Sequence, residues 1–238
     1  MKKLKQGLLA GAMLACAGSA SAGIIEFSEN FDNGQLNSGG FVTTGLHAFS
    51  GGELYTYNRD MFRTADQYFA TQSAPVEFDF TMTFMGGNMS FLAMRVSEDP
   101  YDPNHEPAAG LILRMHNFQD GHTGIGENYQ QNYEFHNPQS GDAFYGYGQP
   151  IEISMTDYGT YVDIAMRNTV TNEENVFSYT SDFFDGGYYG FSTSGGVKID
   201  NVSLRISDDS ELSVDVPEPA SVGLLGAVLL AMRLRRRK

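Results

Sequence analysis

The sequence predicts an all-β protein, an antiparallel β-sandwich of the jelly-roll type. Residues 76–84 alternate apolar and polar side chains over nine positions, which is typical of a strand with one buried face. Similar short segments recur between glycine-rich turns such as Gly186-Gly187 and Gly195-Gly196, and long helix-forming stretches are missing. Short strands joined by such turns indicate a sandwich or barrel of antiparallel sheets.

The predicted strands pair with their neighbours along the chain. Residues 76–84 are expected to form a hairpin with residues 90–96 across the turn Gly86-Gly87-Asn88. Alternation places Leu92, Met94 and Val96 on one face of the second strand. Further strands are expected at residues 111–116, at 151–155 and 161–166, which form a second hairpin, and at 176–179, 188–192 and 198–206.

Residues 117–150 interrupt this pattern. They are rich in Asn, Gln, Gly, Tyr and His and show no sustained apolar period. We interpret them as a long surface excursion between strands. Such loops either carry function or are simply mobile, and the residues alone leave both readings open.

Residues 1–22 have the pattern of a secretory signal peptide. Three lysines precede a short apolar run at residues 8–17, and Ala20-Ser21-Ala22 supplies a small-residue cleavage site. Cleavage after Ala22 implies Sec-type export machinery and signal peptidase as partners; the alternative is a buried N-terminal helix. Cys16 is the single cysteine of the chain, so the mature protein is expected to contain no disulfide or thiolate site.

The C-terminal end combines Pro217-Glu218-Pro219, an apolar segment at residues 220–232 and a cluster of five basic residues. Thirteen residues rise about 20 Å as a helix, which is less than the roughly 30 Å hydrocarbon core of a bilayer. The basic residues would stay on the cytoplasmic side. We therefore expect transient or retained membrane anchoring by this helix, with an acidic linker at 208–215 between it and a single sandwich domain at 23–207.

Residues 216–238 resemble the PEP-CTERM sorting signal, because Pro217, Glu218 and Pro219 match its signature tripeptide and the helix and basic cluster match the rest. In that family a membrane enzyme called exosortase processes the tail, and the cargo is often linked to exopolysaccharide and biofilm production. The resemblance implies exosortase as a partner and export across the inner membrane to the cell envelope, the cell surface or the medium. An ordinary single-pass tail anchor is the alternative.

The mature region is strongly acidic. Removing three N-terminal lysines, five C-terminal basic residues and Glu218 from the totals of 15 basic and 29 acidic residues leaves 7 basic against 28 acidic, a net charge of about −21. Proteins hold nucleic-acid phosphates through clustered Lys and Arg, so this composition excludes nucleic acid as a partner. The acidic surplus fits either solubility or bound divalent cations.

Both ends of the predicted sandwich resemble concanavalin A-like lectin and glucanase sandwiches and related carbohydrate-binding modules. The resemblance rests on residues 26–34 (EFSENFDNG), Gly190-Phe191 and residues 199–204 (IDNVSL). It implies that fold over residues 24–206 and a polysaccharide ligand. In related modules a structural calcium ion often joins the first and last strands, which would nominate Glu29 and Asp200 here; the alternative is that Asp200 only shapes a strand.

Residues 99–106 offer a second candidate calcium site. Asp99 and Asp102 lie among four oxygen-bearing side chains in this segment, and calcium prefers oxygen ligands from loops. The segment lacks the glycine and the spacing of an EF-hand loop. Structural calcium is the one cofactor that the sequence suggests.

Sugar recognition commonly uses an aromatic platform, and the chain contains no tryptophan. Tyrosine rings can take that place. The candidates in loop-like or edge-like stretches are Tyr55, Tyr57, Tyr188 and Tyr189, together with Tyr145 and Tyr147. The alternative is that these rings cap the edges of the sandwich.

The sequence contains no complete catalytic or metal motif. Glu77 and Asp79 begin the E-x-D-x-x-E pattern of sandwich glucanases, but Met82 replaces the second Glu, so we interpret the pair as the solvent-facing half of a strand. His116 and His122 could approach one zinc ion, although their spacing matches no established site.

We expect a non-catalytic surface protein that binds exopolysaccharide or other matrix glycans. The alternatives are a glycan-cleaving hydrolase, whose carboxylates come from separate strands, and a self-associating matrix protein.

Overall fold

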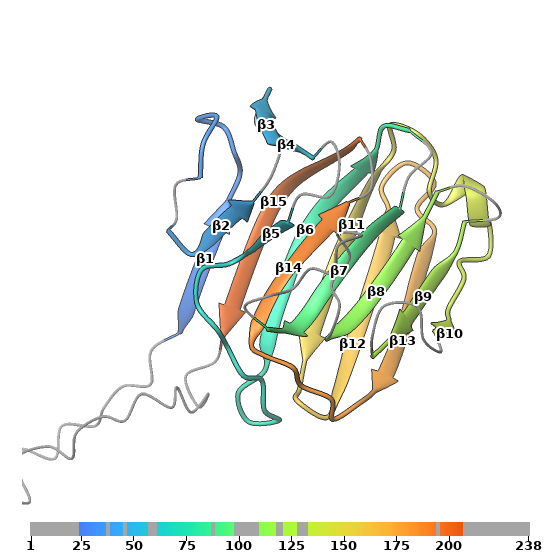
Figure 1. The fold of residues 1–238 in the computed structure, drawn as a ribbon. Coiled ribbons are helices and arrows are strands. Elements are labelled where there is room, and N and C mark those ends of the chain that lie inside the picture. The colour runs from blue at the N-terminus through green and yellow to red at the C-terminus, as the bar shows by residue number, and fades with distance from the viewer. Residues whose placement is uncertain are drawn as a thin grey trace, which may run out of the picture.

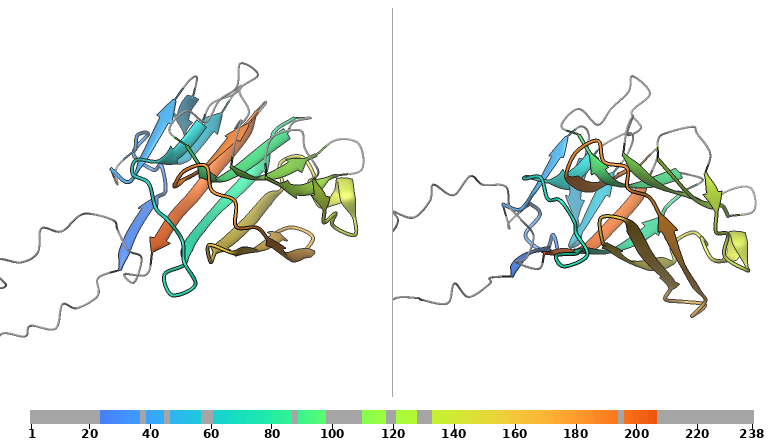
Figure 2. Two further views of the ribbon diagram at one scale, coloured as in Figure 1. Left: turned by 60° about the horizontal axis from the view of Figure 1, so that its bottom comes forward. Right: turned by 90° about the horizontal axis from the view of Figure 1, so that it is seen from below.

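The computed structural model consists of two antiparallel β-sheets packed face to face (Figure 1). Figure 2 shows the two layers from two further directions. The only helical element among the described residues is a 3-10 turn, η1, at Gly141–Ala143. The structure describes residues 24–36, 39–44, 47–56, 61–86, 89–97, 110–117, 121–127, 133–193 and 196–206. The predicted all-β sandwich is confirmed.

Sheet A contains eight strands in the order β13-β12-β11-β6-β15-β4-β3, and β1 also pairs with β15. Its strands are β1 (Ile25–Glu29), β3 (His47–Ser50), β4 (Glu53–Thr56), β6 (Val76–Phe84), β11 (Pro150–Asp157), β12 (Tyr161–Asn168), β13 (Glu174–Thr180) and β15 (Val197–Ile206). The long strand β15 pairs along one edge with β6, and along the other with β4 and then β1. Ile25 therefore lies opposite Ile206, so the two ends of the domain are neighbours.

Sheet B contains seven strands in the order β10-β9-β8-β7-β14-β5-β2. They are β2 (Phe41–Thr44), β5 (Met61–Thr64), β7 (Met89–Val96), β8 (Leu111–His116), β9 (Thr123–Gly126), β10 (Glu134–Phe135) and β14 (Tyr188–Thr193). In Figure 1, β9 and β10 lie at the edge of the sandwich farthest from β1.

The core lies between the sheets. The apolar residues of β6 and the alternate residues Leu111, Leu113 and Met115 of β8 are fully or almost fully buried in it, as strand alternation requires. Phe191 of sheet B connects the layers, because its ring stacks 4.8 Å from Phe62 and lies 5.4 Å from Phe80 of sheet A. This packing holds both sheets in a fixed relation.

The predicted hairpin of residues 76–84 and 90–96 is wrong. Both strands exist, but β6 pairs with β11 and β15 in sheet A, whereas β7 pairs with β8 and β14 in sheet B. Alternation identifies the face that a strand buries but not the strand beside it. The second predicted hairpin is confirmed, because β11 and β12 are paired along their length. Ile151 lies opposite Asn168 at one end, and Asp157 lies opposite Val162 at the other.

The prediction that Val96 shares a face of β7 with Leu92 and Met94 is wrong. Val96 clusters with Ala93 and Tyr188, apart from the main core that contains Leu92 and Met94. The cause is a β-bulge, since Arg95 has a positive φ of 55° and the pairing with β14 shifts between Tyr188 and Gly190. A bulge inserts one residue and reverses the facing beyond it.

The predicted surface excursion at residues 117–150 is wrong in part. β9 is buried at all four positions, β10 extends sheet B, and Phe144 and Tyr145 belong to the core. β9 has the sequence Thr-Gly-Ile-Gly, whose two glycines remove the alternation that marks other strands.

Several predicted segments lie outside the described residues. These are the signal peptide with Ala22, the linker at 208–215, and the tail at 216–238 with its apolar helix. Within the described ranges, no helix is both long and apolar enough to span a membrane.

Candidate functional site

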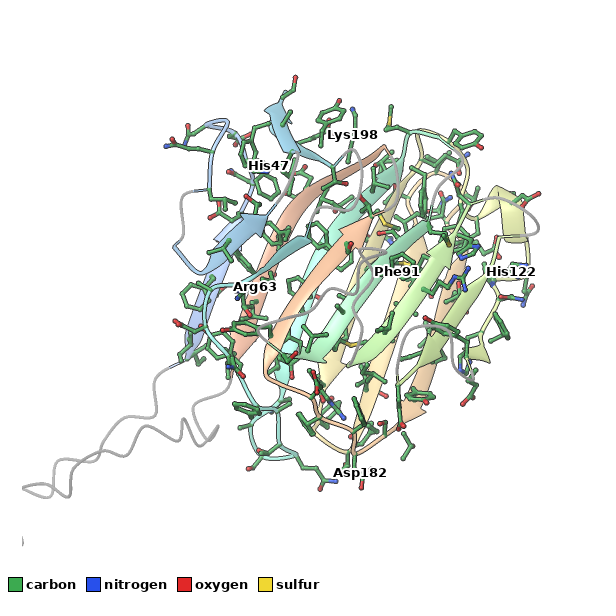
Figure 3. All side chains as sticks on the ribbon, in the orientation of Figure 1. His47, Arg63, Phe91, His122, Asp182 and Lys198 are labelled. Carbon is green, nitrogen blue, oxygen red and sulfur yellow. The ribbon has the colours of Figure 1, made fainter. Side chains whose placement is uncertain are left out.

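A pocket lies on the outer face of sheet B, over β8, β9 and the segment that follows. We call it the histidine pocket. It has a volume of about 460 Å³ and is lined by Arg114, His116, His122, Gly124, Phe135 and Asn137. Figure 3 shows His122 toward the edge of the sandwich, far from the end at which Asp182 lies.

Strand alternation places the polar side chains in the pocket. Leu111, Leu113 and Met115 of β8 point into the core, so Arg114 and His116 project from the opposite face. The sequence analysis singled out His116, together with His122, but not Arg114. The alternation of residues 111–116 nevertheless places Arg114 and His116 on one face.

Gly124 allows the aromatic side of the pocket to form. A Cβ atom at this position would lie 3.2 Å from Cβ of Tyr133 and 3.3 Å from the ring of Phe135. The bare backbone of β9 therefore lets these two residues lie close above it. The Phe135 side chain remains 63% exposed, and its ring centroid lies 6.1 Å from that of His122.

The segment carrying Phe135 is held from two sides. The amide N–H of Thr123 donates to Oδ1 of Asn137 at 3.0 Å. The ring of His136 stacks on Phe177 of sheet A at 4.2 Å, and Nδ2 of Asn175 donates to the His136 carbonyl at 2.7 Å. These contacts fix β10 and hence the position of the exposed ring.

Arg114 provides the positive charge of the pocket. Its Nε donates a short hydrogen bond to Nε2 of His116, one Nη lies 3.2 Å from Sδ of Met89, and the guanidinium lies 5.7 Å from the Tyr133 ring centroid. Burial, followed by the charges of Arg114 and His122, lowers the pKa of His116 to about 4. His116 is therefore neutral at neutral pH, and its Nε2 can accept the hydrogen bond that Arg114 donates.

His122 contributes an unsatisfied polar atom. Its Nδ1 is buried and has no hydrogen-bond partner among the described residues. A buried polar atom of this kind costs stability unless a ligand or water satisfies it. The two histidine rings lie 6.2 Å apart, and no three His, Cys, Asp or Glu side chains within the described ranges gather as metal ligands. The zinc interpretation of this histidine pair thus lacks a third ligand in the described part of the chain.

Of the tyrosines predicted to bind sugar, Tyr145, Tyr188 and Tyr189 are buried, whereas Tyr147 is 62% exposed. Tyr189 is fully buried and its hydroxyl donates to Asp157 at 2.8 Å, and Tyr188 is 5% exposed, with the Arg63 guanidinium 3.9 Å from its ring centroid. Tyr55 on β4 is partly buried, and Nζ of Lys198 lies 4.9 Å from its ring centroid. Tyr57 lies outside the described residues.

The two residues nominated for calcium lie near the seam of β1 and β15. Glu29 is buried opposite Val202 and lines a cavity of about 310 Å³ with Asn201. Asp200 accepts hydrogen bonds from the N–H of Asn201 at 2.7 Å and from its Nδ2 at 3.0 Å, and Asn201 has a positive φ of 50°. Asp200 therefore also shapes the strand, as the alternative interpretation expected.

The Asp200 carboxyl at this seam is protonated more readily than an ordinary aspartate. Burial raises the pKa of the Asp200 carboxyl, the Asn201 N–H opposes the rise, and the nearby Glu53 and Asp32 add to it. No three carboxylates meet at one point among the described residues, so a calcium ion at this seam would need backbone or amide oxygens beside the carboxylate of Glu29. Asp99 and Asp102 lie outside the described residues.

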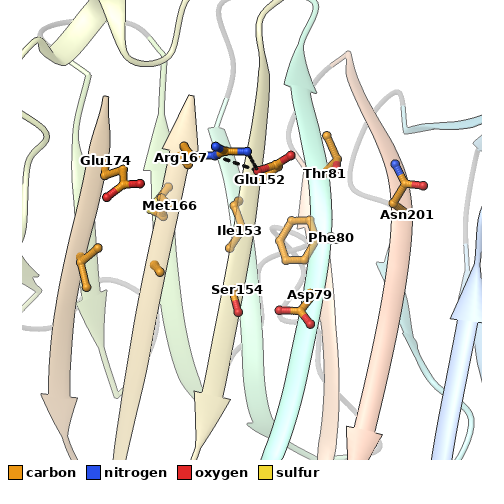
Figure 4. A pocket seen from close by; sticks show the side chains of 12 residues that line it. Asp79, Phe80, Thr81, Glu152, Ile153, Ser154, Met166, Arg167, Glu174 and Asn201 are labelled. Carbon is orange, nitrogen blue, oxygen red and sulfur yellow. Dashed lines mark hydrogen bonds and ion pairs between the residues drawn. The ribbon is translucent and has the colours of Figure 1, made fainter. Parts of the chain in front are cut away.

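The outer face of sheet A forms a second, more acidic groove (Figure 4) of about 360 Å³. Asp79, Glu152 and Glu174 line it, and Arg167 contacts Glu152 through Nε at 3.0 Å and Nη2 at 2.7 Å. Glu77 lies 3.6 Å from Arg205 of the neighbouring strand. The outward facing of Glu77 and Asp79 agrees with the sequence interpretation, since Met82 lies in the core.

The fold is that of a legume-lectin-like sandwich. Lectin II from Ulex europaeus is 11% identical with a TM-score of 0.58, covering 77% of this chain and 98% of its own. Arcelin-5, a lectin-like defense protein from Phaseolus vulgaris, is 12% identical with a TM-score of 0.56, covering 77% and 98%. A Bauhinia forficata lectin in complex with GalNAc is 10% identical with a TM-score of 0.58, covering 78% and 99%.

The tail supplies the second part of the classification. A family model described as a PEP-CTERM protein-sorting motif matches residues 215–238. The chain therefore carries this sorting signal and is directed to the cell envelope or surface. No curated protein matches the sequence.

Proposed function

We propose that this chain is an exported, non-catalytic glycan-binding protein whose ligand site is the histidine pocket. The observation that carries the proposal is the exposed ring of Phe135 beside the unsatisfied Nδ1 of His122, on a fold shared with lectins. An aromatic ring offers an apolar surface to the C–H face of a sugar, and a few fixed polar atoms orient its hydroxyls.

The sorting motif supports the place of action. After export through Sec-type machinery and signal peptidase cleavage, exosortase processes the tail and the sandwich reaches the surface. There its ligand is an exopolysaccharide or another matrix glycan, which gives the protein a role in biofilm.

Glycan-array binding by residues 23–238 in detergent micelles tests the proposal. Phe135→Ala should weaken the affinity for the bound glycan about tenfold or more, equivalent to about 1.4 kcal/mol. Phe69→Ala is the matched control, because Phe69 is also an exposed aromatic, at 46%, but does not line the histidine pocket, and it should bind like the wild type. Binding to no glycan, or equal effects of both substitutions, would contradict the proposal.

The same samples separate the other functional classes. New reducing ends on a matrix glycan would indicate a hydrolase, for which the carboxylates of the sheet A groove are the first candidates. Concentration-dependent sedimentation without glycan binding would indicate a self-associating matrix protein.

Structural calcium at the β1–β15 seam is a separate part of the proposal. It is supported by the buried carboxylate of Glu29 and by the cavity that Glu29 shares with Asn201. Adding calcium should raise the unfolding temperature of the wild type, and Glu29→Gln should remove that rise. An unfolding temperature that does not respond to calcium would refute it.

A further inference from the structure

We propose that the histidine pocket recognises an acidic sugar, with Arg114 as the charge partner of the ligand carboxylate. This proposal rests on the proposed function and names the ligand class of the same site. A uronate is the simplest sugar of this kind.

The distribution of charge singles out Arg114. Most basic side chains among the described residues pair with a carboxylate: Arg95 with Asp157, Arg167 with Glu152, Lys198 with Glu53 and Arg205 with Glu77. None of the ion pairs between described residues includes Arg63 or Arg114. Arg63 and Arg114 are thus the two of the six described Lys and Arg side chains for which no carboxylate partner lies in the described part of the chain.

Arg63 and Arg114 differ in what surrounds them. The Arg63 guanidinium stacks on the Tyr188 ring, and its Nη1 donates to the Thr64 carbonyl at 2.8 Å. Arg114 instead lines a pocket, and one of its Nη groups contacts the thioether of Met89, which is a weak acceptor. A carboxylate in the pocket would replace that weak contact with a charge-assisted hydrogen bond.

The lining of the histidine pocket suits an anion. None of its six lining residues is acidic, whereas the sheet A groove contains three carboxylates and the seam cavity contains Glu29. The described acidic residue next to Phe135 in sequence is Glu134. Its Oε1 lies 3.1 Å from Nε2 of His136. An anion is therefore repelled least in the histidine pocket.

The remaining groups complete the recognition of a sugar acid. Because His116 accepts from Arg114 through Nε2, the guanidinium is oriented before the ligand arrives. Phe135 and His122 flank the space beside it, so the ring of the sugar can lie on Phe135 while its carboxylate reaches Arg114.

The test compares two probes on residues 23–238 in detergent micelles by calorimetry. One probe is a galacturonate oligomer, and the other is the same oligomer with its carboxyls reduced to alcohols. We expect the wild type to bind the acidic oligomer at least about tenfold more tightly, with affinity that falls as salt rises. Arg114→Gln should remove most of that preference, while Arg205→Gln, which alters an exposed arginine of sheet A, should leave it unchanged.

Each outcome is decisive. Equal binding of the two oligomers refutes the acidic ligand but leaves glycan binding intact. A preference for the acidic oligomer that survives Arg114→Gln refutes the role of Arg114. No binding of either oligomer, with no binding on a glycan array, refutes the proposed function as well. If Arg114→Gln unfolds, as circular dichroism would reveal, the two-probe comparison on the wild type still decides the ligand class.

Discussion

Arg95 and Asp157 form a fully buried ion pair that joins the two sheets. Nη2 of Arg95 lies 2.6 Å from Oδ1 of Asp157, and its Nε donates to Oδ2 at 2.8 Å. The Tyr189 hydroxyl and the Gly159 N–H also donate to this carboxylate, and Nη1 of Arg95 donates to the Ser181 carbonyl. Such a pair tolerates burial only because nearly every donor and acceptor has a partner.

Replacing Asp157 should therefore destabilise the sandwich strongly. Asp157→Asn leaves the Arg95 charge buried without its counter-charge, and we expect a loss of about 3–5 kcal/mol in the free energy of unfolding. Urea unfolding followed by far-ultraviolet circular dichroism measures it. Glu152→Gln is the control, because the Glu152–Arg167 pair is about half exposed and should contribute less than about 1 kcal/mol. Equal losses of unfolding free energy in the two variants would show that breaking the buried pair destabilises the protein no more than breaking the exposed pair.

Gly190 should not tolerate a side chain. A Cβ atom there would lie 2.1 Å from the Phe62 carbonyl oxygen and 2.7 Å from Cα of Arg63, so β14 and β5 would have to separate. Gly190→Ala should cost about 1–3 kcal/mol or more in unfolding free energy. Gly196→Ala, whose nearest contact would be 3.7 Å away, should unfold like the wild type. A Gly190→Ala protein of unchanged stability would contradict the close approach of the two strands.

His116 should make stability depend on pH in the acidic range. Its folded-state pKa is lowered from 6.5 to about 4, so the unfolded chain binds the proton first as the pH falls. This stability is fully present above about pH 6.5 and is lost as the pH falls toward 4, with a slope of at most about 1.4 kcal/mol per pH unit.

His116→Asn should flatten that slope in urea unfolding series between pH 7 and 4. His47→Gln, on β3 of the other sheet, is the control for the loss of a histidine elsewhere in the fold. An unchanged slope in His116→Asn would assign the acid sensitivity to other groups.

The sorting tripeptide should determine where the protein accumulates. Replacing Pro217, Glu218 and Pro219 by alanine should leave most of the chain in the inner-membrane fraction, because the matched sorting motif is lost. Cell fractionation with immunodetection of the sandwich measures this. Glu211→Ala in the linker should not alter the distribution, and surface delivery of the triple variant would mean that the tripeptide is dispensable.

The sequence predicted strands more reliably than their partners. The bounds of β6 and the β11–β12 hairpin were predictable, because alternation and a short turn are local properties. The partner of β7 was not, since its pairing with β14 joins residues about a hundred positions apart. The inward turn of Arg95 also depends on a bulge, which alternation does not reveal.

The histidine pocket was predictable only in part. The alternation of residues 111–116 places Arg114 and His116 on one face, and His122 follows nearby in sequence. The position of Phe135 depends on Gly124, which lets the ring lie over β9, and on the stacking of His136 against Phe177. Both contacts involve residues 117–150, which the sequence presents as an irregular loop.

The position of β15 restricts when the protein can finish folding. This strand is the last of the domain, yet it lies inside sheet A, between β6 on one edge and β4 and β1 on the other. A chain that crosses a membrane with its N-terminus leading must therefore deliver residue 206 before sheet A can close, since pairings between distant segments form late. Translocation of such a chain and its final folding are thereby ordered in time, because sheet A stays incomplete until its last strand has been delivered.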